Sequence, residues 1–173
     1  MKKTTIIWIV VVNVILIGSI IALYFTVWKS DQELEVGYLT ITGIGEDIKL
    51  SIDDLQSLPN ISKEYTLEGS GTTIIVNYTG VSVYYLLTEI ANITSKVNVK
   101  VIPTDNYDIT FPSDDFNNTR DCIIAYMKNG QYLKNYRQGG FGPLRLIFPQ
   151  SYDPYNAQFC VKFVVALEIT PIT

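Results

Sequence analysis

The feature that most constrains this chain is an apolar run near its N-terminus, residues 4–28, which has 25 residues and no charged side chain. A helix of that length spans the hydrocarbon core of a bilayer. A cleaved signal peptide is the alternative, but its apolar core is normally about 7 to 15 residues and ends at a small-residue cleavage site. Lys2 and Lys3 precede the run, and positive charge favours the cytoplasmic side. We therefore expect residues 1–3 in the cytoplasm and an uncleaved transmembrane helix over residues 4–28.

The rest of the chain is large enough for one extracytoplasmic domain with its own core, over residues 38–173, after a juxtamembrane linker over residues 29–37. Three of the 13 Lys and Arg lie in the first 30 positions, so the remainder carries 13 − 3 = 10 of them against all 17 Asp and Glu, a net charge of 10 − 17 = −7. Nucleic acid requires a basic face, which excludes it as a partner. The expected partners are the membrane, through residues 4–28, and a membrane or extracytoplasmic protein.

The domain has the pattern of many short strands with two or three short helices. Ser51 is expected to cap a short helix that Pro59 ends, and Ser82 a helix over Val83–Ala91. Asn129-Gly130 between two strand-like segments is the strongest short hairpin signal. Strands are expected at residues 36–42, 61–68, 72–78, 97–102, 107–111, 122–128, 131–133, 144–148 and 159–169. Helices and strands do not alternate as in a parallel sheet, so the fold class is α+β.

Two kinds of residue bear on export. Four Asn-X-Ser/Thr sequons are candidate glycan acceptors of an exported domain, at Asn60, Asn77, Asn92 and Asn117. The two cysteines, Cys122 and Cys160, lie in apolar segments that are expected to be strands. A disulfide between them suits an oxidising compartment, whereas two buried free thiols would act as small apolar side chains. The sequence leaves both interpretations open.

A glycine-bounded loop that runs into an apolar strand, Gln138–Pro149, is the most informative motif of the domain. Further landmarks come in order along the chain: Leu39–Gly43, Leu50–Pro59, Tyr78–Leu87, Tyr107–Pro112, Ile124–Gly130, Val161–Phe163 and Leu167–Ile169. In this order and spacing they resemble the molybdopterin-binding domain of sulfite oxidase-like oxidoreductases, over most of residues 38–170. The resemblance implies that family's fold.

The departures from the family are as informative as the matches. The family holds its metal through one cysteine in a Leu-Glu-Cys context, and the corresponding residues here are Leu67-Glu68-Gly69. Glycine offers no thiolate, and the chain has no histidine. We therefore expect no catalytic residue, no metal ligand and no cofactor. Molybdopterin stays open as the alternative cofactor, because its own dithiolene sulfur also binds the metal.

Three residues are candidates for holding a ligand. Arg145, in the Leu-Arg-Leu landmark, suits a phosphate or carboxylate, and Lys162 would add a second cation. Ser70, between Gly69 and Gly71, lies where backbone amides could cradle an anion. For each there is an ordinary alternative: a solvated or ion-paired cation in the first two cases, and a plain hairpin turn in the third.

Three functions follow. The first is a non-catalytic binding or interaction module, anchored outside the membrane, that keeps the family's fold without molybdenum. The second is a molybdopterin-dependent oxidoreductase that passes electrons to a membrane partner. The third keeps the fold for another ligand, an anionic pterin-like or nucleotide-like molecule held by Arg145 and Lys162.

Overall fold

The computed structural model describes residues 37–43, 45–69, 71–135, 138–154 and 156–172. The chain divides into two compact units, residues 1–35 and 36–173, and all described residues belong to the second. The expected transmembrane helix over residues 4–28 and the candidate ligand residue Ser70 lie outside the described residues. Within those ranges, no helix has the length and apolar character needed to cross a bilayer.

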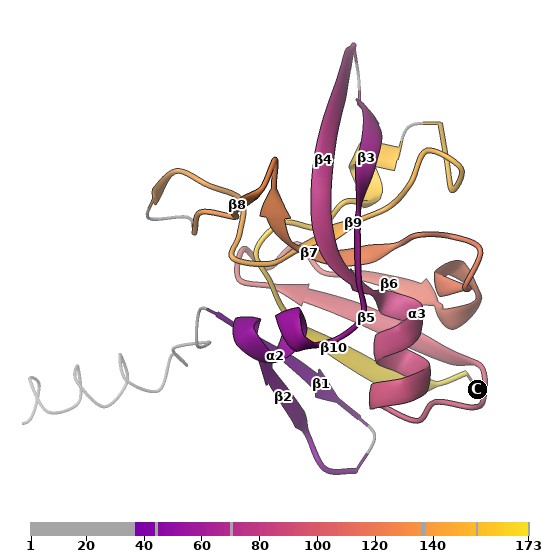
Figure 1. Cartoon of the computed structure of the whole chain (residues 1–173). Coiled ribbons are helices and arrows are strands. Elements are labelled where there is room, and N and C mark those ends of the chain that lie inside the picture. Colours follow the sequence, from indigo (N-terminus) through magenta and orange to yellow (C-terminus); the bar gives the residue numbers. More distant parts are fainter. Residues whose placement is uncertain (1–36, 44, 70, 136–137, 155, 173) are drawn as a thin grey trace, which may run out of the picture. The chain divides into compact units, whose positions relative to one another are not determined.

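One sheet has five strands in the order β2-β1-β10-β5-β6 (Figure 1). They are β1 (Tyr38–Thr42), β2 (Ile48–Ser51), β5 (Val97–Pro103), β6 (Ile109–Pro112) and β10 (Val164–Pro171). β1 and β10 run parallel, and the other neighbours are antiparallel. In β5, buried residues alternate with half-buried ones from Val97 to Pro103. This period of two is that of a strand with one face on the core.

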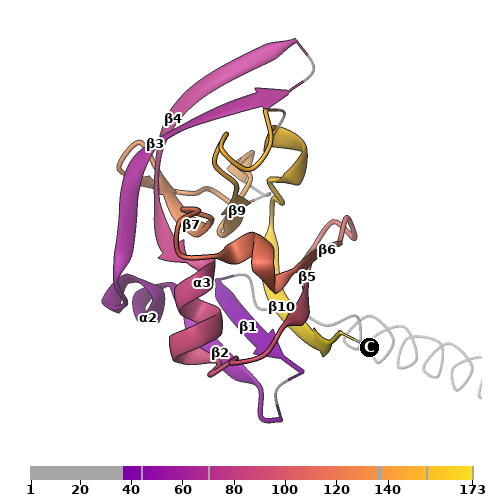
Figure 2. The same ribbon diagram turned by 90° about the vertical axis from the view of Figure 1, so that its right-hand side faces the viewer.

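The second sheet is built on a long hairpin (Figures 1 and 2). Its strands are β3 (Asn60–Gly69), β4 (Thr72–Ser82), β7 (Ile123–Lys128), β8 (Gln131–Tyr132) and β9 (Arg145–Ile147). β3 and β4 pair along their whole length, whereas β7 pairs only with the base of β4, from Tyr78 to Ser82. A Cβ on Gly80 would lie 2.2 Å from the Ile124 carbonyl oxygen. Only glycine therefore allows β4 and β7 to approach at this point.

The helical segments within the described residues are short: α2 (Ile52–Ser57), α3 (Val83–Tyr85), the π-helix η1 (Leu86–Ile90) that continues it, and the 3₁₀ helices η2 (Ser113–Phe116) and η4 (Asn156–Phe159). The expected N-cap at Ser51 is confirmed, because its hydroxyl accepts from the Asp54 N–H while the Asp54 carboxylate accepts from the Ser51 N–H. This reciprocal pair is a capping box. Ser82 likewise accepts from the Tyr85 N–H.

The core joins residues of both sheets and of the helix that follows β4. Leu39, Val99 and Leu167 of the first sheet and Ile124 of the second are completely buried in one apolar cluster. Aromatic rings extend this cluster toward β9, where Phe148 contacts rings at centroid distances of 4.4–5.5 Å: Phe111, Phe116 and Tyr152.

The α+β class is confirmed, but three elements differ from the sequence expectation. β2 was not expected, β4 continues beyond Tyr78 to Ser82, and the strand expected at residues 159–169 begins only at Val164, after η4 has ended at Phe159. Cys122 and Cys160 were expected in strands, but Cys122 lies immediately before β7 and Cys160 lies between η4 and β10. In each case pairing with a distant strand or packing of a loop decided the element, and local sequence does not report either.

Candidate functional site

The glycine loop before β9 is shaped by close contact with the segment that follows β8. A Cβ on Gly140 would lie 2.0 Å from the Lys134 carbonyl oxygen, and one on Gly142 would lie 2.4 Å from the Leu133 Cβ. The Gly142 N–H donates to the Lys134 carbonyl over 2.9 Å, and the Gly142-Pro143 peptide bond is cis. The glycines thus hold the loop against its neighbour and leave the Phe141 side chain exposed.

Arg145 begins β9 and points into the protein, with 9% of its surface exposed. Its Nη1 donates to the Tyr78 hydroxyl over 2.8 Å. The guanidinium carbon lies 5.8 Å from the centroids of both the Tyr78 and the Phe141 rings. Burial raises the pKa of the Tyr78 phenol, and the adjacent guanidinium acts in the opposite direction. The Tyr78 hydroxyl is therefore neutral and serves as an acceptor.

The charge of Arg145 is incompletely matched within the described part of the chain. Its Nε is buried and has no hydrogen-bond partner there. The ion pairs that the structure gives join other residues: Lys63 with Asp121, Lys96 with Asp114, Lys100 with Asp108, and Arg120 with Asp115. A buried charge is normally paired, because its desolvation is costly. Arg145 is therefore suited to meet an anion.

Lys162 lies beside Arg145 because the segment before β10 runs along the glycine loop. The Phe163 N–H donates to the Phe141 carbonyl over 3.2 Å, and the Leu146 N–H donates to the Val161 carbonyl over 2.8 Å. Lys162 is exposed, and its Nζ lies 4.5 Å from the centroid of the Phe141 ring. Two of the three candidate ligand residues thus meet at one aromatic side chain. We call Phe141, Arg145 and Lys162 the cation cluster.

A hollow of about 300 Å³ lies at Lys162, the member of the cation cluster that lines it. Asp105, Tyr107, Cys160 and Ala157 also line it. Ala157 is also the neighbour of Gly69, since a Cβ built on Gly69 would lie 3.6 Å from the Ala157 Cβ. Gly69, which the sequence resemblance matches to the family's cysteine, is thereby next to the wall of this hollow. Its backbone would accept a side chain, because 3.6 Å is an ordinary van der Waals contact.

Neither cysteine supplies the thiolate that Gly69 lacks. Burial raises the pKa of the Cys122 thiol to about 12 and also raises that of Cys160. Cys160 Sγ accepts from the Phe148 N–H and donates to the Asn156 carbonyl, both at 3.4 Å. A metal-binding sulfur is a thiolate, whereas these two are protonated thiols at neutral pH. The donor groups around Gly69 therefore do not fit a molybdenum centre.

The structure has Cys122 and Cys160 as free, buried thiols, so the disulfide interpretation is wrong for this structure. Each sulfur is buried and contacts a nearby backbone group in place of the other cysteine. Cys122 Sγ contacts the Asp115 carbonyl at 3.8 Å, and Cys160 bonds within its own turn. Both behave as the small apolar side chains of the alternative interpretation.

Acidic residues do not form a reactive group in the described part of the chain. No three Asp, Glu or Cys side chains there are arranged to hold a metal ion. Lys100 and Asp108 form an exposed ion pair that lowers the pKa of the carboxyl group. Asp115 accepts from both Arg120 and the Tyr152 hydroxyl. These carboxylates are structural or solvated.

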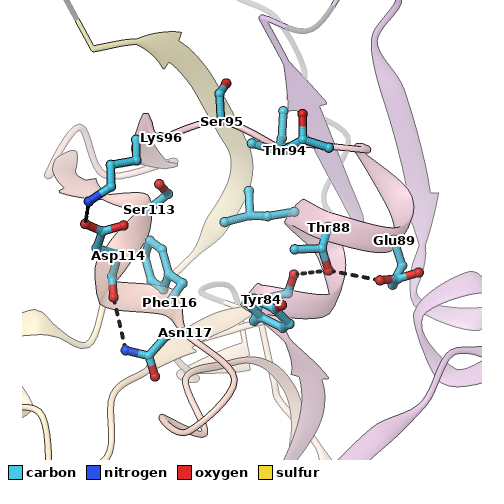
Figure 3. A pocket seen from close by; sticks show the side chains of 12 residues that line it. Tyr84, Thr88, Glu89, Thr94, Ser95, Lys96, Ser113, Asp114, Phe116 and Asn117 are labelled. Carbon is cyan, nitrogen blue, oxygen red and sulfur yellow. Dashed lines mark hydrogen bonds and ion pairs between the residues drawn. The ribbon is translucent and has the colours of Figure 1, made fainter.

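Two larger hollows lie away from the cation cluster. One, of about 580 Å³, opens between the helix α3–η1 and η2 (Figure 3). Leu87 and Phe116 form its buried floor, and the Lys96–Asp114 ion pair lies on its rim. The other, of about 630 Å³, is lined mostly by apolar residues, including Ile48, Ile90 and Ile169. Size alone would favour these hollows, but neither contains an unmatched buried charge among the described residues.

The four sequon asparagines are at least partly accessible. Asn60, Asn77 and Asn92 are exposed, and Asn117 is half-buried. The Asn117 amide donates to the Asp114 carbonyl over 3.1 Å, so its nitrogen already has a partner. Glycosylation stays a prediction at all four positions.

Sequence reasoning missed two residues that position this site. Tyr78 was noted only as part of a landmark, although it is the partner of Arg145. Asn156 was not noted at all. It is completely buried, accepts from the Glu68 N–H over 3.0 Å, and donates to the Thr66 and Phe148 carbonyls over 2.9 and 2.8 Å. These bonds hold the end of β3, and hence Gly69, against η4.

Comparisons with known proteins identify the family and the fold. The sequence model described as the oxidoreductase molybdopterin binding domain matches residues 32–171. Among solved structures, the chain is similar to the sulfane dehydrogenase SoxCD from Paracoccus pantotrophus, with a TM-score of 0.64 and 18% identity. The similarity covers 82% of this chain and 40% of that one, so the chain spans about two fifths of its structural relative. A search of curated protein sequences finds no match.

Proposed function

Because the chain belongs to the oxidoreductase molybdopterin-binding domain family, whose sequence model matches residues 32–171, we propose that it is a binding module of that family without molybdenum redox chemistry. The proposal rests on Gly69, which by the resemblance of Leu67-Glu68-Gly69 to the family's Leu-Glu-Cys corresponds to the metal-binding cysteine. Cys160 lines the adjoining hollow, but its thiol is buried and protonated. A cysteine binds a metal as its thiolate.

The ligand that suits the remaining residues is a small organic anion. Arg145 supplies a buried guanidinium whose Nε has no partner among the described residues, and Lys162 supplies an exposed ammonium on the same aromatic ring. Arginine binds phosphate and carboxylate groups with paired N–H donors. Phe141 holds both cations at its ring and is 46% exposed, so it adds apolar surface to the site, which favours an anion attached to an apolar ring. A pterin-like or nucleotide-like molecule has this chemistry.

The sequence supports a place for this module at a membrane. Residues 4–28 are long and apolar enough for an anchor, and Lys2 and Lys3 favour a cytoplasmic N-terminus. The domain would then lie outside the cytoplasm, where a membrane or extracytoplasmic protein is its expected partner. Protease added to intact cells tests this arrangement, because it should digest the domain. A domain that is digested only after lysis would overturn the proposed orientation.

Ligand-dependent stabilisation tests the anion site. The full chain in detergent is heated with GMP, and inorganic phosphate serves as an anion without a ring. A ligand that binds only the folded state at 100 times its Kd stabilises by about 2.7 kcal/mol. We expect a higher Tm with GMP than with phosphate, and no GMP shift in Arg145→Met or Lys162→Ala.

Lys49→Ala is the matched control, since Lys49 Nζ also lies over an aromatic ring, 4.4 Å from the Tyr38 centroid, but on β2. Its GMP response should equal that of the unmodified chain. The anion site would be overturned if GMP shifted the Tm of Lys162→Ala and Lys49→Ala equally. It would also be overturned if neither GMP nor phosphate shifted the Tm of the unmodified chain.

The alternative, a molybdopterin-dependent oxidoreductase that passes electrons to a membrane partner, rests on family membership and on the cation cluster. Those features support binding of an organic anion such as a pterin, but they do not supply a metal ligand. Metal content distinguishes the two functions, and a stoichiometric molybdenum content would favour the alternative.

A further inference from the structure

The outer half of β4 presents a free strand edge. β7 pairs with β4 only from Tyr78 to Ser82, so residues 72–76 have β3 on one side and no described strand on the other. Figures 1 and 2 both show this part of the β3–β4 hairpin extending beyond β7. A free edge exposes a row of backbone N–H and C=O groups that can pair with another strand.

The backbone groups that face this edge can be assigned from Asn77. Its N–H donates to the Asn129 Oδ1 over 3.2 Å, and its carbonyl accepts from the Asn129 N–H over 2.8 Å, on the side of β7. Alternate residues of a strand direct their N–H and C=O groups to the same side. Ile75 and Thr73 therefore direct theirs to the free edge, and Asn129 ends that edge at Asn77.

The fold covers the opposite edge of the same hairpin. The side chain of Asn156 takes the Glu68 N–H and the Thr66 carbonyl of β3. The β4 edge has no such cover among the described residues. Its sequence, Thr72-Thr-Ile-Ile-Val76, also lacks the charges and prolines that usually protect an exposed edge. Ile74 and Ile75 are 49% and 60% exposed. Both are β-branched, and β-branched residues favour strand pairing, so the edge exposes side chains suited to a further strand.

We propose that this edge pairs with the same edge of a second copy of the chain. The backbone N–H and C=O groups of Thr73 and Ile75 fix the register. All of them can form hydrogen bonds between the two copies only if Thr73 of one copy lies opposite Ile75 of the other. Ile74 of one copy then lies opposite Ile74 of the other, on the two-fold axis, and Thr72 lies opposite Val76. The same patch on both subunits is the geometry of an isologous dimer.

A second copy is the occupant because the edge is complementary to itself: in this register the backbone groups of Thr73 and Ile75 in one copy meet those of Ile75 and Thr73 in the other. The part of the chain from residue 31 onward carries 10 − 17 = −7, so most contacts between two copies would bring like charges together. The five paired residues carry no charge, and this register places no charged residue opposite another. Strand pairing over five residues buries less than the roughly 1,600 Å² of a standard interface. The expected dimer is therefore weak and depends on concentration.

Cysteine cross-linking of the full chain in detergent tests the register. In an antiparallel pair without mutual hydrogen bonds the two Cα atoms lie about 4.5 Å apart, which a disulfide can bridge. Ile74→Cys should form disulfide-linked dimers under mild oxidation, at least about fivefold more than Thr73→Cys or Ile75→Cys alone. Those two variants face each other and should cross-link only when mixed. The unmodified chain is the baseline, because Cys122 and Cys160 are buried.

A charge substitution provides the second measurement. Ile75→Lys should abolish concentration-dependent association in sedimentation experiments, whereas Gln131→Lys, an exposed strand position elsewhere in the same sheet, should leave it unchanged. Equal cross-linking at residues 73, 74 and 75 would overturn the register. A chain that stays monomeric at all concentrations, or a dimer that persists in Ile75→Lys, would overturn the proposal itself.

Discussion

Tyr78 and Arg145 form a buried polar pair, and a double-mutant cycle shows whether the fold or a ligand requires it. Arg145 Nη1 donates to the Tyr78 hydroxyl over 2.8 Å, and the arginine is 9% exposed. No described carboxylate pairs with the guanidinium. The effective cost of burying such a charge is several kcal/mol. We therefore expect Arg145 to lower the free energy of unfolding when no ligand is bound.

The magnitudes follow from what each substitution leaves behind. Tyr78→Phe removes the acceptor of a charged donor, which costs about 1.5–3 kcal/mol. The double variant Tyr78→Phe/Arg145→Met removes both polar groups and keeps similar side-chain volume. Replacing a buried charged group with apolar residues is often neutral or stabilising by about 1–4 kcal/mol. The double variant should thus equal or exceed the unmodified chain in its free energy of unfolding.

Urea unfolding followed by far-ultraviolet circular dichroism measures this cycle. Both tryptophans, Trp8 and Trp28, precede the domain, so tryptophan fluorescence would not report its unfolding. A double variant less stable than Tyr78→Phe would refute the reasoning, because the pair would then stabilise the fold and no ligand would be needed to explain it.

Three further predictions concern the scaffold. Asn156→Ala removes three hydrogen bonds of a completely buried side chain. At roughly 1 kcal/mol for each bond, it should lower the free energy of unfolding by about 2–4 kcal/mol. Urea unfolding measures this loss, and a loss no larger than that of the exposed Asn118→Ala would contradict the prediction. Gly69→Ala should fold with little change in Tm. Gly80→Ala should lower the free energy of unfolding by about 2–3 kcal/mol, because its Cβ would lie 2.2 Å from the Ile124 carbonyl oxygen. Equal Tm values for the two variants would contradict these contacts. Burial raises the pKa of the Cys122 thiol from 9.0 to about 12, so above pH 9 the folded state keeps a proton that the unfolded state loses. The free energy of unfolding should therefore fall by about 1.4 kcal/mol per pH unit from pH 9 upward. Cys122→Ala should show a shallower fall with pH, and an unchanged fall would show that other groups cause the pH dependence.

Local signals were predictable from the sequence. The capping residue Ser51 and the Asn129-Gly130 hairpin depend on neighbours within a few positions, and both are confirmed. Asn129 and Gly130 have φ of 52° and 74°, the left-handed values that this turn requires. The family landmarks were also readable, because their order and spacing survive in the chain.

Features that depend on distant contacts were not predictable. The parallel pairing of β1 with β10 joins the two ends of the domain, and β2 is a strand only because β1 lies beside it. Arg145 and Lys162 were candidate residues, but their meeting at Phe141 depends on how the segment before β10 packs on the glycine loop. The state of Cys122 and Cys160 likewise depends on geometry that sequence spacing does not contain.

The molybdenum content of the full chain tests the central claim most directly. The chain is purified in detergent from cells that make the molybdenum cofactor, and its metal is measured by mass spectrometry beside a molybdenum enzyme expressed in the same cells. With glycine at position 69 and protonated thiols at Cys122 and Cys160, our account predicts molybdenum far below one atom per chain while the comparison enzyme is loaded. One molybdenum atom per chain would contradict it.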